Sequence, residues 1–397
     1  MTTDDIVSAH DTARVLLERQ RAAQATDPVP GLDERRADLA RLRTALLDER
    51  ASLLAALRED FGQRPDEGSL LLDVEPTVRG LAYLRRHLRR WMQPEPRHVA
   101  WEFRQGRAFV VRQPLGVVGV VSPWNVPLGL ALMPLGTALA AGNRVLLKPS
   151  ERSPATSAAL VDLLGRLFPP EQVAVVTGGP EVGAAFAALP FDHLLFTGST
   201  AVARSVMAAA SAHLTPLTLE LGGKSPVLVD RGVDLNELAS DVLFGKTLNA
   251  GQLCLAPDTL LLHEDDVAGF VRAWRGAFRR AYPAGRADPN LTAILDDQHL
   301  QRLQALLEDA RAAGARVECL DEEGSAGTHG AIHERVLLPA LVHDVDPSMA
   351  IAREEIFGPW LVVETYVDLD EAVARVNARP RALVLALYTR RAEARRR

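Results

Sequence analysis

The stretch PLGVVGVVSPWNVPLGLALMPLGTALAAGN, residues 114–143, decides the fold class of this chain of 397 residues. It contains no charged residue and is long enough to cross a bilayer, so a membrane span is one interpretation. However, Pro123, Pro127 and Pro134 interrupt the stretch, and Asn125 lies inside it. A buried strand followed by a loop and a buried helix fits this pattern better, so we expect no membrane partner.

Short apolar runs alternate with helical patterns from Gly116 onward. In the first series VVGVVS, RVLLK, QVAVVTG and HLLFTG precede helical patterns near residues 130–141, 154–168, 182–189 and 201–212. A second series contains SPVLVD, TLLLHE, ARVECL, RVLLPALV, WLVVETY and ALVLALYT, with helices expected near 235–248, 267–282, 297–314 and 369–377. Apolar strands that alternate with helices indicate parallel sheets covered on both faces. We therefore predict an α/β fold of two Rossmann-like three-layer domains with parallel sheets, divided around ELGGKSP, residues 220–226.

Helical and hairpin patterns precede this series. Residues 35–60 have leucines at helical spacing among many charged residues, which predicts an amphipathic surface helix. A second helical stretch, 70–91, ends in the basic run LRRHLRRWM, for which a solvated helix face is a better interpretation than phosphate binding. Residues 96–116 alternate between apolar and polar around Gln105 and Gly106, which predicts a β-hairpin.

The composition is that of an ordinary globular protein, with 47% hydrophobic and 24% charged residues. A formal net charge of −6 leaves no electrostatic footprint for nucleic acid. Cys254 and Cys319 are the only cysteines, and no cysteine or histidine cluster has metal-ligand spacing, so we expect no metal. This cysteine usage fits a reducing compartment, and the acidic N-terminus does not resemble a signal peptide. We therefore expect a cytoplasmic protein.

Two strand ends carry residues suited to a nucleotide. In FTGST, Gly198 permits a tight turn, and Ser199 can cap the following helix and present donors to a phosphate. In LLKPSERSP, Lys148 and Glu151 follow a strand at the sheet edge where ligands gather, and both can hold ribose hydroxyls. The alternatives are an ordinary strand–helix turn and a surface ion pair.

Two further motifs offer a base and an amide. Glu220 follows an apolar strand and precedes Gly222 and Gly223, where a ligand can approach the backbone closely. A carboxylate in that place can act as a general base. Asn125 lies in SPWNVP, where prolines stiffen the loop, and an amide donor on a rigid loop suits an oxyanion. The alternative for both residues is an ordinary turn.

The thiol of Cys254 has two interpretations. Free cysteines are often inert residues of the core. The surrounding NAGQLCLAP, residues 249–257, is typical of a loop rather than a packed helix. A thiol on a loop near helix termini can become a nucleophilic thiolate.

Taken in order, SPWNVP, LLKPSE, FTGST, LELGGKSP, NAGQLCLAP and EEIFGP resemble the motifs of the aldehyde dehydrogenase superfamily. The resemblance runs from about residue 30 to about residue 389. GQLCLAPD and the short N-terminal region look most like the class 3 branch. RRHLRRWM and LPFDHLLFTGSTAVA are similar to its bacterial, coniferyl-aldehyde dehydrogenase-like members.

The resemblance implies a mechanism for three residues. Cys254 would attack the aldehyde carbonyl, and the Asn125 amide with the Cys254 backbone N–H would hold the oxyanion. Hydride transfer would leave a thioester, and Glu220 would then activate water to release the carboxylic acid. The implied substrate is a small aldehyde, either aromatic, such as coniferyl aldehyde, or medium-chain aliphatic.

The resemblance also implies the cofactor and its ligands. NAD is the first expectation because the charge of Glu151 disfavours a 2′-phosphate, while the nearby Lys148 keeps NADP possible. Lys148 and Glu151 would hold the adenine ribose, and Ser199 with the helix N-terminus the pyrophosphate. The other implied cofactor-binding residues are Trp124, Gly198, Gly222, Glu355 and Phe357.

The family pattern implies that different segments of the chain form domains with different functions. Residues 1–97 and 113–221 would form the NAD(P)-binding domain, and 222–397 the catalytic domain that carries the thiol. The hairpin, residues 98–112, would be an arm that bridges subunits. A homodimer is the class 3 expectation.

Three departures from the family pattern stand out. Val126 replaces an aromatic residue often seen after the asparagine, and Leu253 replaces a threonine often seen before the cysteine. After ALYT the chain continues as RRAEARRR without a PFGGxGxSG-type segment, so we expect that a C-terminal segment is missing. An alternative function is therefore a catalytically impaired homologue that retains only nucleotide binding. A cysteine hydrolase is a third candidate, although no histidine partner flanks Cys254.

Overall fold

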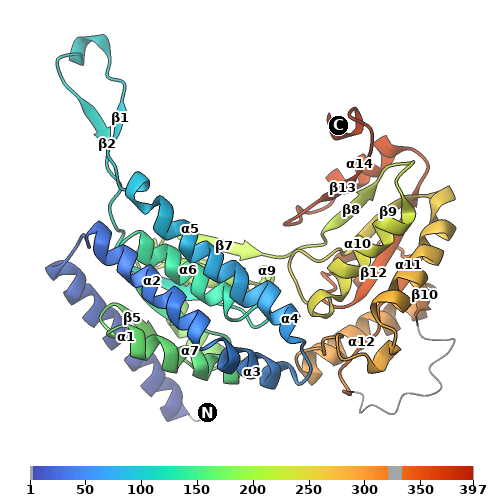
Figure 1. Cartoon of the computed structure of the whole chain (residues 1–397), viewed down its shortest axis with the longest axis horizontal. Helices are drawn as coiled ribbons and strands as arrows, with labels where there is room; N and C mark the ends of the chain where they lie inside the picture. The colour runs from blue at the N-terminus through green and yellow to red at the C-terminus, as the bar shows by residue number, and fades with distance from the viewer. Residues whose placement is uncertain (1–2, 321–332, 397) are drawn as a thin grey trace. The chain divides into compact units, whose positions relative to one another are not determined.

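The computed structural model describes residues 3–320 and 333–396 (Figure 1). The chain forms two compact units, each with its own sheet and core. Unit 1 comprises Met1–Asp60 and Ser69–Glu220, and unit 2 comprises Phe61–Gly68 and Leu221–Arg397. The predicted α/β class with two sheets is confirmed.

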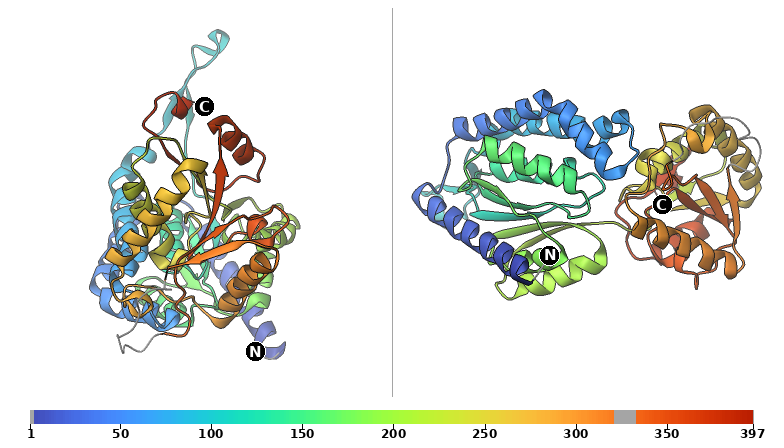
Figure 2. Two further views of the ribbon diagram at one scale, coloured as in Figure 1. Left: turned by 90° about the vertical axis from the view of Figure 1, so that its right-hand side faces the viewer. Right: turned by 90° about the horizontal axis from the view of Figure 1, so that it is seen from below.

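The sheet of unit 1 has five strands in the order β5-β4-β3-β6-β7. Strand β3 pairs in parallel with β4 and with β6, and β4 pairs in parallel with β5. Helices cover both faces of this sheet (Figure 2). The strands are β3 (Val117–Val121), β4 (Arg144–Lys148), β5 (Val173–Val175), β6 (His193–Gly198) and β7 (Leu217–Leu221), and the helices after them are α6 (Gly129–Ala140), α7 (Pro154–Leu167), α8 (Pro180–Ala187) and α9 (Thr200–Ser211).

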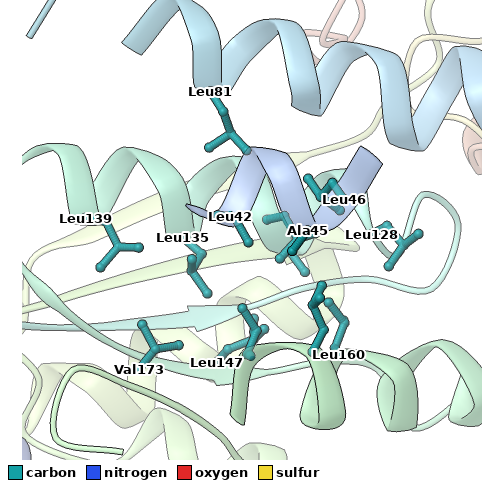
Figure 3. Packing of buried hydrophobic residues seen from close by; sticks show 14 of the residues in the cluster. Leu42, Ala45, Leu46, Leu81, Leu128, Leu135, Leu139, Leu147, Leu160 and Val173 are labelled. Atoms are coloured by element: carbon teal, nitrogen blue, oxygen red, sulfur yellow. The ribbon is translucent and has the colours of Figure 1, made fainter. Parts of the chain in front are cut away.

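The core of unit 1 lies between this sheet and the amphipathic helices that precede it in the chain. Leucines of α2 (Leu32–Asp48) and α5 (Glu75–Trp91) pack against α6 and the strands, as Leu42, Leu81, Leu135 and Leu147 illustrate in Figure 3. These side chains are fully buried. At about 25 cal/mol for each Å² of apolar surface removed from water, such burial is the main favourable term for this unit.

The N-terminal helices differ in detail from the prediction. The single helix expected over 35–60 is two helices, α2 and α3 (Arg50–Phe61), with Glu49 between them. The stretch expected as one helix over 70–91 contains a π-helical turn, η1 (Leu70–Val74), between α4 (Asp66–Ser69) and α5. Helix α1 (Thr3–Thr26) was not predicted.

Carboxylates from this N-terminal region cap two helices of the sheet layer. Asp73, on the π-helical turn, accepts hydrogen bonds from the backbone N–H groups of Leu128 (2.9 Å) and Gly129 (3.0 Å) at the start of α6. Asp60 accepts from the N–H groups of Ala155 (2.8 Å) and Thr156 (2.9 Å) at the start of α7. Both caps satisfy donors that a helix leaves unpaired in its first turn.

The predicted hairpin is present and begins earlier than expected. Strands β1 (Glu95–Arg97) and β2 (Ala108–Val110) pair antiparallel, and a 3₁₀ turn, η2 (Trp101–Phe103), lies between them. Trp101 and Phe103 are 75% and 71% exposed. The arm therefore presents large apolar side chains to solvent.

The sheet of unit 2 has six strands in the order β10-β11-β12-β9-β8-β13. All pairs are parallel except that of the edge strand β10 with β11, which is antiparallel. An antiparallel edge strand is common on parallel sheets of this size. The strands are β8 (Pro226–Val229), β9 (Thr259–His263), β10 (Arg316–Cys319), β11 (Ala340–His343), β12 (Trp360–Tyr366) and β13 (Ala386–Tyr388).

Helices on both sides of this sheet enclose separate parts of the unit 2 core. On one side α10 (Leu235–Thr247) and α11 (Val267–Ala281) bury Phe270 and Trp274 with apolar residues of the strands. A second cluster includes Leu303 of α12 (Asp297–Ala312), and a third includes Ala372 of α14 (Leu369–Asn377). The apolar run RVLLPALV forms a strand only from residue 340, because Pro339 has no N–H for a strand ladder.

Within the described ranges, no helix has both the length and the apolar character that a membrane crossing needs. Over those same ranges, no group of three metal-ligating side chains gathers where it could hold an ion.

Candidate active site

Asn125 lies in unit 1 on a loop that is held at both ends. The loop follows β3, and its Ser122 N–H donates to the carbonyl oxygen of Lys148 (3.1 Å). Asp73 holds the other end through the N–H groups of Leu128 and Gly129. Asn125 is only 4% exposed, so its amide is positioned by a fixed and largely dry loop. That is the property an oxyanion donor requires.

Lys148 and Glu151 meet directly at the end of β4. The ammonium of Lys148 donates to the Glu151 carboxylate (3.0 Å) and to the carbonyl of Pro149 (3.2 Å). Burial acts to raise the pKa of Glu151, but a backbone hydrogen bond and the charges of Lys148 and Arg152 outweigh it and leave that pKa below its ordinary value. Glu151 is therefore a carboxylate at neutral pH and can accept hydrogen bonds from hydroxyl groups.

Ser199 caps helix α9, as expected. Its hydroxyl oxygen accepts a hydrogen bond from the Val202 N–H (3.4 Å), and the residue itself has extended backbone angles. A Cβ at Gly198 would lie 2.6 Å from the Phe196 ring, so a larger residue at this position would displace that ring. Glu220, near the end of β7, is exposed and can reach a water molecule.

Cys254 lies in unit 2, on the loop between α10 and β9. This loop begins with η3 (Leu248–Gly251), in which Asn249, Ala250 and Gly251 all have positive φ angles of 52°, 53° and 69°. Such angles are costly for Asn249 and Ala250, so the surrounding structure must impose them.

Buried Gln252 holds this loop in place. Its Nε2 donates to the carbonyls of Asn249 (3.0 Å) and Ala293 (3.1 Å), and its Oε1 accepts from the N–H of Leu295 (3.0 Å). Two residues later, Cys254 is half-buried, and the Ser225 hydroxyl donates to its carbonyl oxygen (3.4 Å). Cys254 and Cys319 form no disulfide. The thiol thus lies on a fixed loop and outside the fully buried core.

The EEIFGP segment packs against the Cys254 loop in unit 2. A Cβ at Gly251 would overlap the carbonyl oxygen of Gly358, so the two backbones touch where both residues are glycine. Phe357 has a positive φ of 49°, which is unusual for a bulky residue. The loop that carries the thiol therefore depends on the conformation of this segment.

Glu355 of this segment lies against Gly222, and the N–H of Gly223 donates a hydrogen bond to its carboxylate. A Cβ at Gly222 would overlap that carboxylate. Burial is the main reason that the pKa of Glu355 rises to about 7, and the negative charge of Asp258 adds to it. Lys246 and Arg302 oppose the rise only in part.

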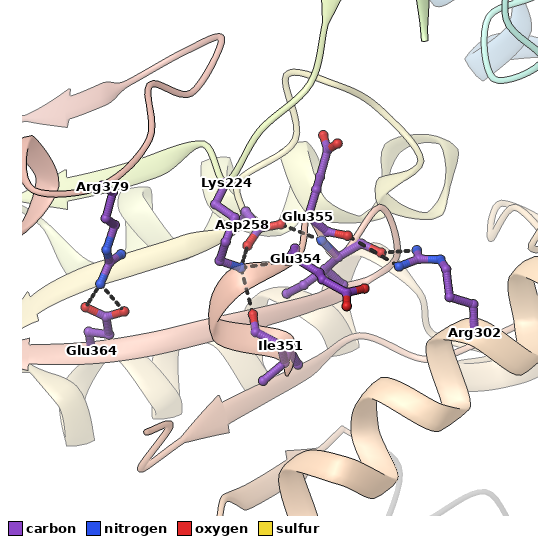
Figure 4. A network of polar contacts seen from close by, with 9 residues as sticks. Lys224, Asp258, Arg302, Ile351, Glu354, Glu355, Glu364 and Arg379 are labelled. Carbon is purple, nitrogen blue, oxygen red and sulfur yellow. Dashed lines mark hydrogen bonds and ion pairs between the residues drawn. The ribbon is translucent and has the colours of Figure 1, made fainter. Parts of the chain in front are cut away.

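Four charged residues near Glu355 were not singled out from the sequence: Lys224, Lys246, Asp258 and Arg302. Lys224 pairs with Asp258, and Arg302 binds backbone carbonyls (Figure 4). Lys246 is almost fully buried, and its burial lowers its pKa to about 8. A lysine inside the apolar helical pattern VLFGKTL was the signal that could have found it.

The predicted site residues thus fall into two groups. Unit 1 contains Trp124, Asn125, Lys148, Glu151, Gly198, Ser199 and Glu220, and brings Lys148 and Glu151 into contact. Unit 2 contains Gly222, Cys254, Glu355 and Phe357, and brings Gly222 against Glu355. Unit 1 therefore contains the predicted amide and base, Asn125 and Glu220, and unit 2 contains the predicted nucleophile, Cys254.

Residues 4–397 match the model of the aldehyde dehydrogenase family. The chain is 45% identical over 373 residues to the "probable coniferyl aldehyde dehydrogenase" of Pseudomonas aeruginosa, which covers 94% of this chain and 77% of that protein. It is 36% identical over 378 residues to rat aldehyde dehydrogenase family 3 member B1, covering 95% of this chain and 78% of the relative.

Solved structures show the same architecture. The substrate-bound AldH of Staphylococcus aureus superposes with a TM-score of 0.89 at 31% identity, over 96% of this chain and 81% of the other. The NAD+ complex of a Mycobacterium tuberculosis aldehyde dehydrogenase gives a TM-score of 0.86 at 30% identity, over 97% and 79%. Since the match extends over nearly all of this sequence and both of its units, the chain belongs to the aldehyde dehydrogenase family.

Proposed function

We propose that this protein oxidises an aldehyde to the carboxylic acid with NAD(P)+ and that Cys254 is the nucleophile. The observation that carries this proposal is the way in which the surrounding loop holds Cys254 in a fixed position. Gln252 is fully buried and hydrogen-bonded on both sides, and Gly251 packs against Gly358, so the thiol is held on a rigid loop. Such rigidity suits a group that must attack at one defined position.

In the proposed mechanism the Cys254 thiolate forms a bond with the aldehyde carbon, and the carbonyl oxygen becomes an oxyanion. The Asn125 amide and the Cys254 backbone N–H stabilise that oxyanion. A bound NAD(P)+ supplies the acceptor for the hydride that leaves the same carbon. The product on the enzyme is a thioester. Glu220 takes a proton from water, which attacks the thioester and releases the acid and the thiolate.

The residues that we propose for cofactor binding occur in both units. Lys148 and Glu151 would hold the adenine ribose, and Gly198 with Ser199 the pyrophosphate at the start of α9. The rest of the cofactor would contact Trp124, Gly222, Glu355 and Phe357. Of these, Glu355 would bind the nicotinamide ribose. The ionised Glu151 supports NAD over NADP, because a 2′-phosphate beside it would meet a like charge.

The substrate is proposed to be an aromatic aldehyde such as coniferyl aldehyde, or a medium-chain aliphatic aldehyde. The names of the bacterial relatives support the first of these. Leu255, the neighbour of Cys254, is 58% exposed and offers apolar surface close to the thiol in sequence. An apolar aldehyde would cover such surface.

We further propose the roles of the chain segments. Residues 1–97 and 113–221 bind NAD(P), residues 222–397 carry the thiol chemistry, and the hairpin 98–112 joins two subunits into a homodimer. A cytoplasmic location is proposed from the two cysteines, which form no disulfide.

The function is tested with Cys254→Ala against the matched variant Cys319→Ala. NADH formation is followed with coniferyl aldehyde, benzaldehyde and hexanal. Cys254→Ala should lose turnover by about 10³-fold or more, while Cys319→Ala keeps it, since only the former lacks a nucleophile. Both variants should still be stabilised by NAD+ in thermal unfolding.

Two results would contradict the proposal. Turnover by Cys254→Ala at a level near that of the parent would assign the chemistry to another group. Stabilisation of the parent by NAD+ without turnover of any of the three aldehydes would favour a homologue that only binds the nucleotide.

A further inference from the structure

The segment from Glu354 to Pro359 lies between α13 (Ala350–Arg353) and β12 and has no helix or strand of its own. Its backbone polar groups therefore need partners outside a regular ladder. Ile356 is fully buried, so solvent does not supply the partners of its N–H and carbonyl groups. Charged side chains from three other places in unit 2 bind the backbone from Glu354 to Ile356 instead.

Lys224 and Asp258 bind one side of the segment. The two side chains form an ion pair and are 12% and 3% exposed. Asp258 also accepts a hydrogen bond from the Ile356 N–H (2.8 Å), and Lys224 donates to the carbonyls of Ile351 (2.8 Å) and Glu354 (3.1 Å). The pair thus fixes the backbone on both sides of Glu355.

Arg302 of α12 binds the same segment through its other carbonyls. One guanidinium nitrogen donates to the carbonyl of Glu355 (3.4 Å), and another donates to the carbonyl of Ile356 (Figure 4). A guanidinium has several donors in a fixed planar arrangement, whereas an ammonium is a compact point charge. Two adjacent carbonyls in this geometry therefore favour arginine over lysine.

The segment held in this way touches both functional parts of unit 2. Its Glu355 carboxylate accepts the Gly223 N–H, and its Gly358 carbonyl oxygen is in contact with Gly251 of the Cys254 loop. A shift of this backbone would move the Glu355 carboxylate and the support of the thiol loop together. A displacement of about 1 Å is enough to impair catalysis strongly.

We propose that Arg302, acting with the Lys224–Asp258 pair, is a positioning residue that fixes the Glu354–Gly358 backbone and so places Glu355 for the cofactor and supports the Cys254 loop. This inference rests on the proposed function for its catalytic consequence, but not for the order of the segment. Buried ion pairs are weak stabilisers of a fold, because desolvation offsets their attraction. Their value in this place is the geometry that they impose.

The test compares Arg302→Met and Arg302→Lys with Arg379→Met. Arg379 is an arginine of similar exposure in the same unit, and it forms a two-point ion pair with Glu364 (2.6 Å to each oxygen) away from the segment (Figure 4). Hydrogen exchange of the amides in residues 351–358 reports the order of the segment without any need for activity. KM for NAD+ and kcat are measured on the same proteins.

In Arg302→Met the amides of residues 351–358 should exchange about tenfold faster than in the parent, because two charge-assisted hydrogen bonds are lost. KM for NAD+ should rise about tenfold or more, with a smaller fall in kcat. Arg302→Lys should lie between the parent and Arg302→Met. Arg379→Met should leave both the exchange of these amides and KM for NAD+ within about twofold of the parent.

Unchanged exchange of residues 351–358 in Arg302→Met, or an equal increase in Arg379→Met, would overturn the positioning role. Faster exchange without a rise in KM would overturn its link to the cofactor. If the parent shows no turnover with NAD+ while the exchange result holds, the proposed function fails and the structural role of Arg302 stands.

Discussion

Glu355 is a carboxyl group that the fold keeps partly protonated near neutrality. Burial raises its pKa to about 7, from an ordinary value of 4.5. The folded state therefore holds a proton between these two values that the unfolded state has released. The contribution of Glu355 to stability is fully present below about pH 4.5 and is lost as the pH rises through about 7.

Replacing Glu355 by Gln should remove this loss. The free energy of unfolding of Glu355→Gln, relative to that of the parent, should increase between about pH 5 and about pH 8 by up to roughly 3 kcal/mol, because Gln cannot ionise. Urea unfolding at the two pH values measures the change. Taking the difference between variant and parent cancels the titration of groups that do not interact with Glu355.

Glu354→Gln is the matched control, since Glu354 is the adjacent and exposed carboxylate. The pH-dependent increase expected for Glu355→Gln should exceed any change in this control. A difference for Glu355→Gln that stays constant with pH would show that Glu355 ionises as an ordinary glutamate does.

Lys246 has the opposite pH dependence. Its burial lowers its pKa to about 8, from an ordinary value of 10.5, so the unfolded state binds the proton more tightly. Its contribution to stability is present above about pH 10.5 and is lost as the pH falls through about 8.

Among the elements, the loop that carries the thiol depends on close backbone contact rather than on regular structure. Gly251 has a φ of 69°, and a Cβ at this position would overlap the Gly358 backbone. Gly232 has a similar φ of 82°, but nothing lies within 4 Å of a Cβ built there. Substitutions at these two glycines therefore distinguish the cost of backbone strain, which both would share, from the cost of a clash with the Gly358 backbone, which only Gly251 would have.

Gly251→Ala should therefore be more harmful than Gly232→Ala. The latter should cost about 1 kcal/mol of stability and keep full turnover, because it adds only strain at a positive φ. Gly251→Ala adds a clash between two backbones, and it should cost several times as much and lower kcat by about tenfold or more. Urea unfolding measures the loss of stability, and NADH formation measures kcat. Equal losses of stability and of kcat in the two variants would contradict the role of the Gly251–Gly358 contact.

Most helices and strands were predictable from local patterns, and the exceptions have long-range causes. The π-helical turn at residues 70–74 places Asp73 against the start of α6, more than fifty residues further along the chain. Ser153 precedes α7 and makes no capping hydrogen bond with its side chain, because Asp60 of α3 caps that helix. A local pattern contains no information about partners that distant.

At the level of the whole molecule, the hairpin is the part that we propose to bind a second copy. Its large apolar side chains are exposed, whereas soluble monomers rarely expose such side chains together. An extended arm also has little core of its own to stabilise it in isolation. Both properties support the homodimer that we propose.

Replacing Trp101 and Phe103 together by Ser should convert the proposed dimer into a monomer. Light scattering coupled to size-exclusion chromatography measures the mass, which should fall from twice the chain mass to once that mass. The loss of two exposed aromatic anchors accounts for the change, because such residues dominate interface energies.

Leu214→Ser is the control, since Leu214 is 87% exposed in unit 1 and lies outside the hairpin. It should leave the mass unchanged. A double Ser variant that retains the mass of the parent would place the subunit interface elsewhere.

The sequence by itself determined the alternation of strands and helices and indicated candidate residues for the chemistry. Both depend on short-range patterns: an apolar run, a glycine turn or a thiol on a loop can be recognised within about ten residues. It therefore supported the α/β class, the Lys148–Glu151 pair at the end of β4, and Cys254 on a loop.

The tertiary structure alone decided what holds these residues in place. Arg302 reaches the carbonyls of Glu355 and Ile356 across more than fifty residues, and Asp258 reaches the Ile356 N–H across 98. Folding brings together charged groups whose positions in the sequence do not indicate that they interact. Their pairing is set by the shared need of a buried, irregular backbone for hydrogen-bond partners, and only the packed chain determines which side chains satisfy that need.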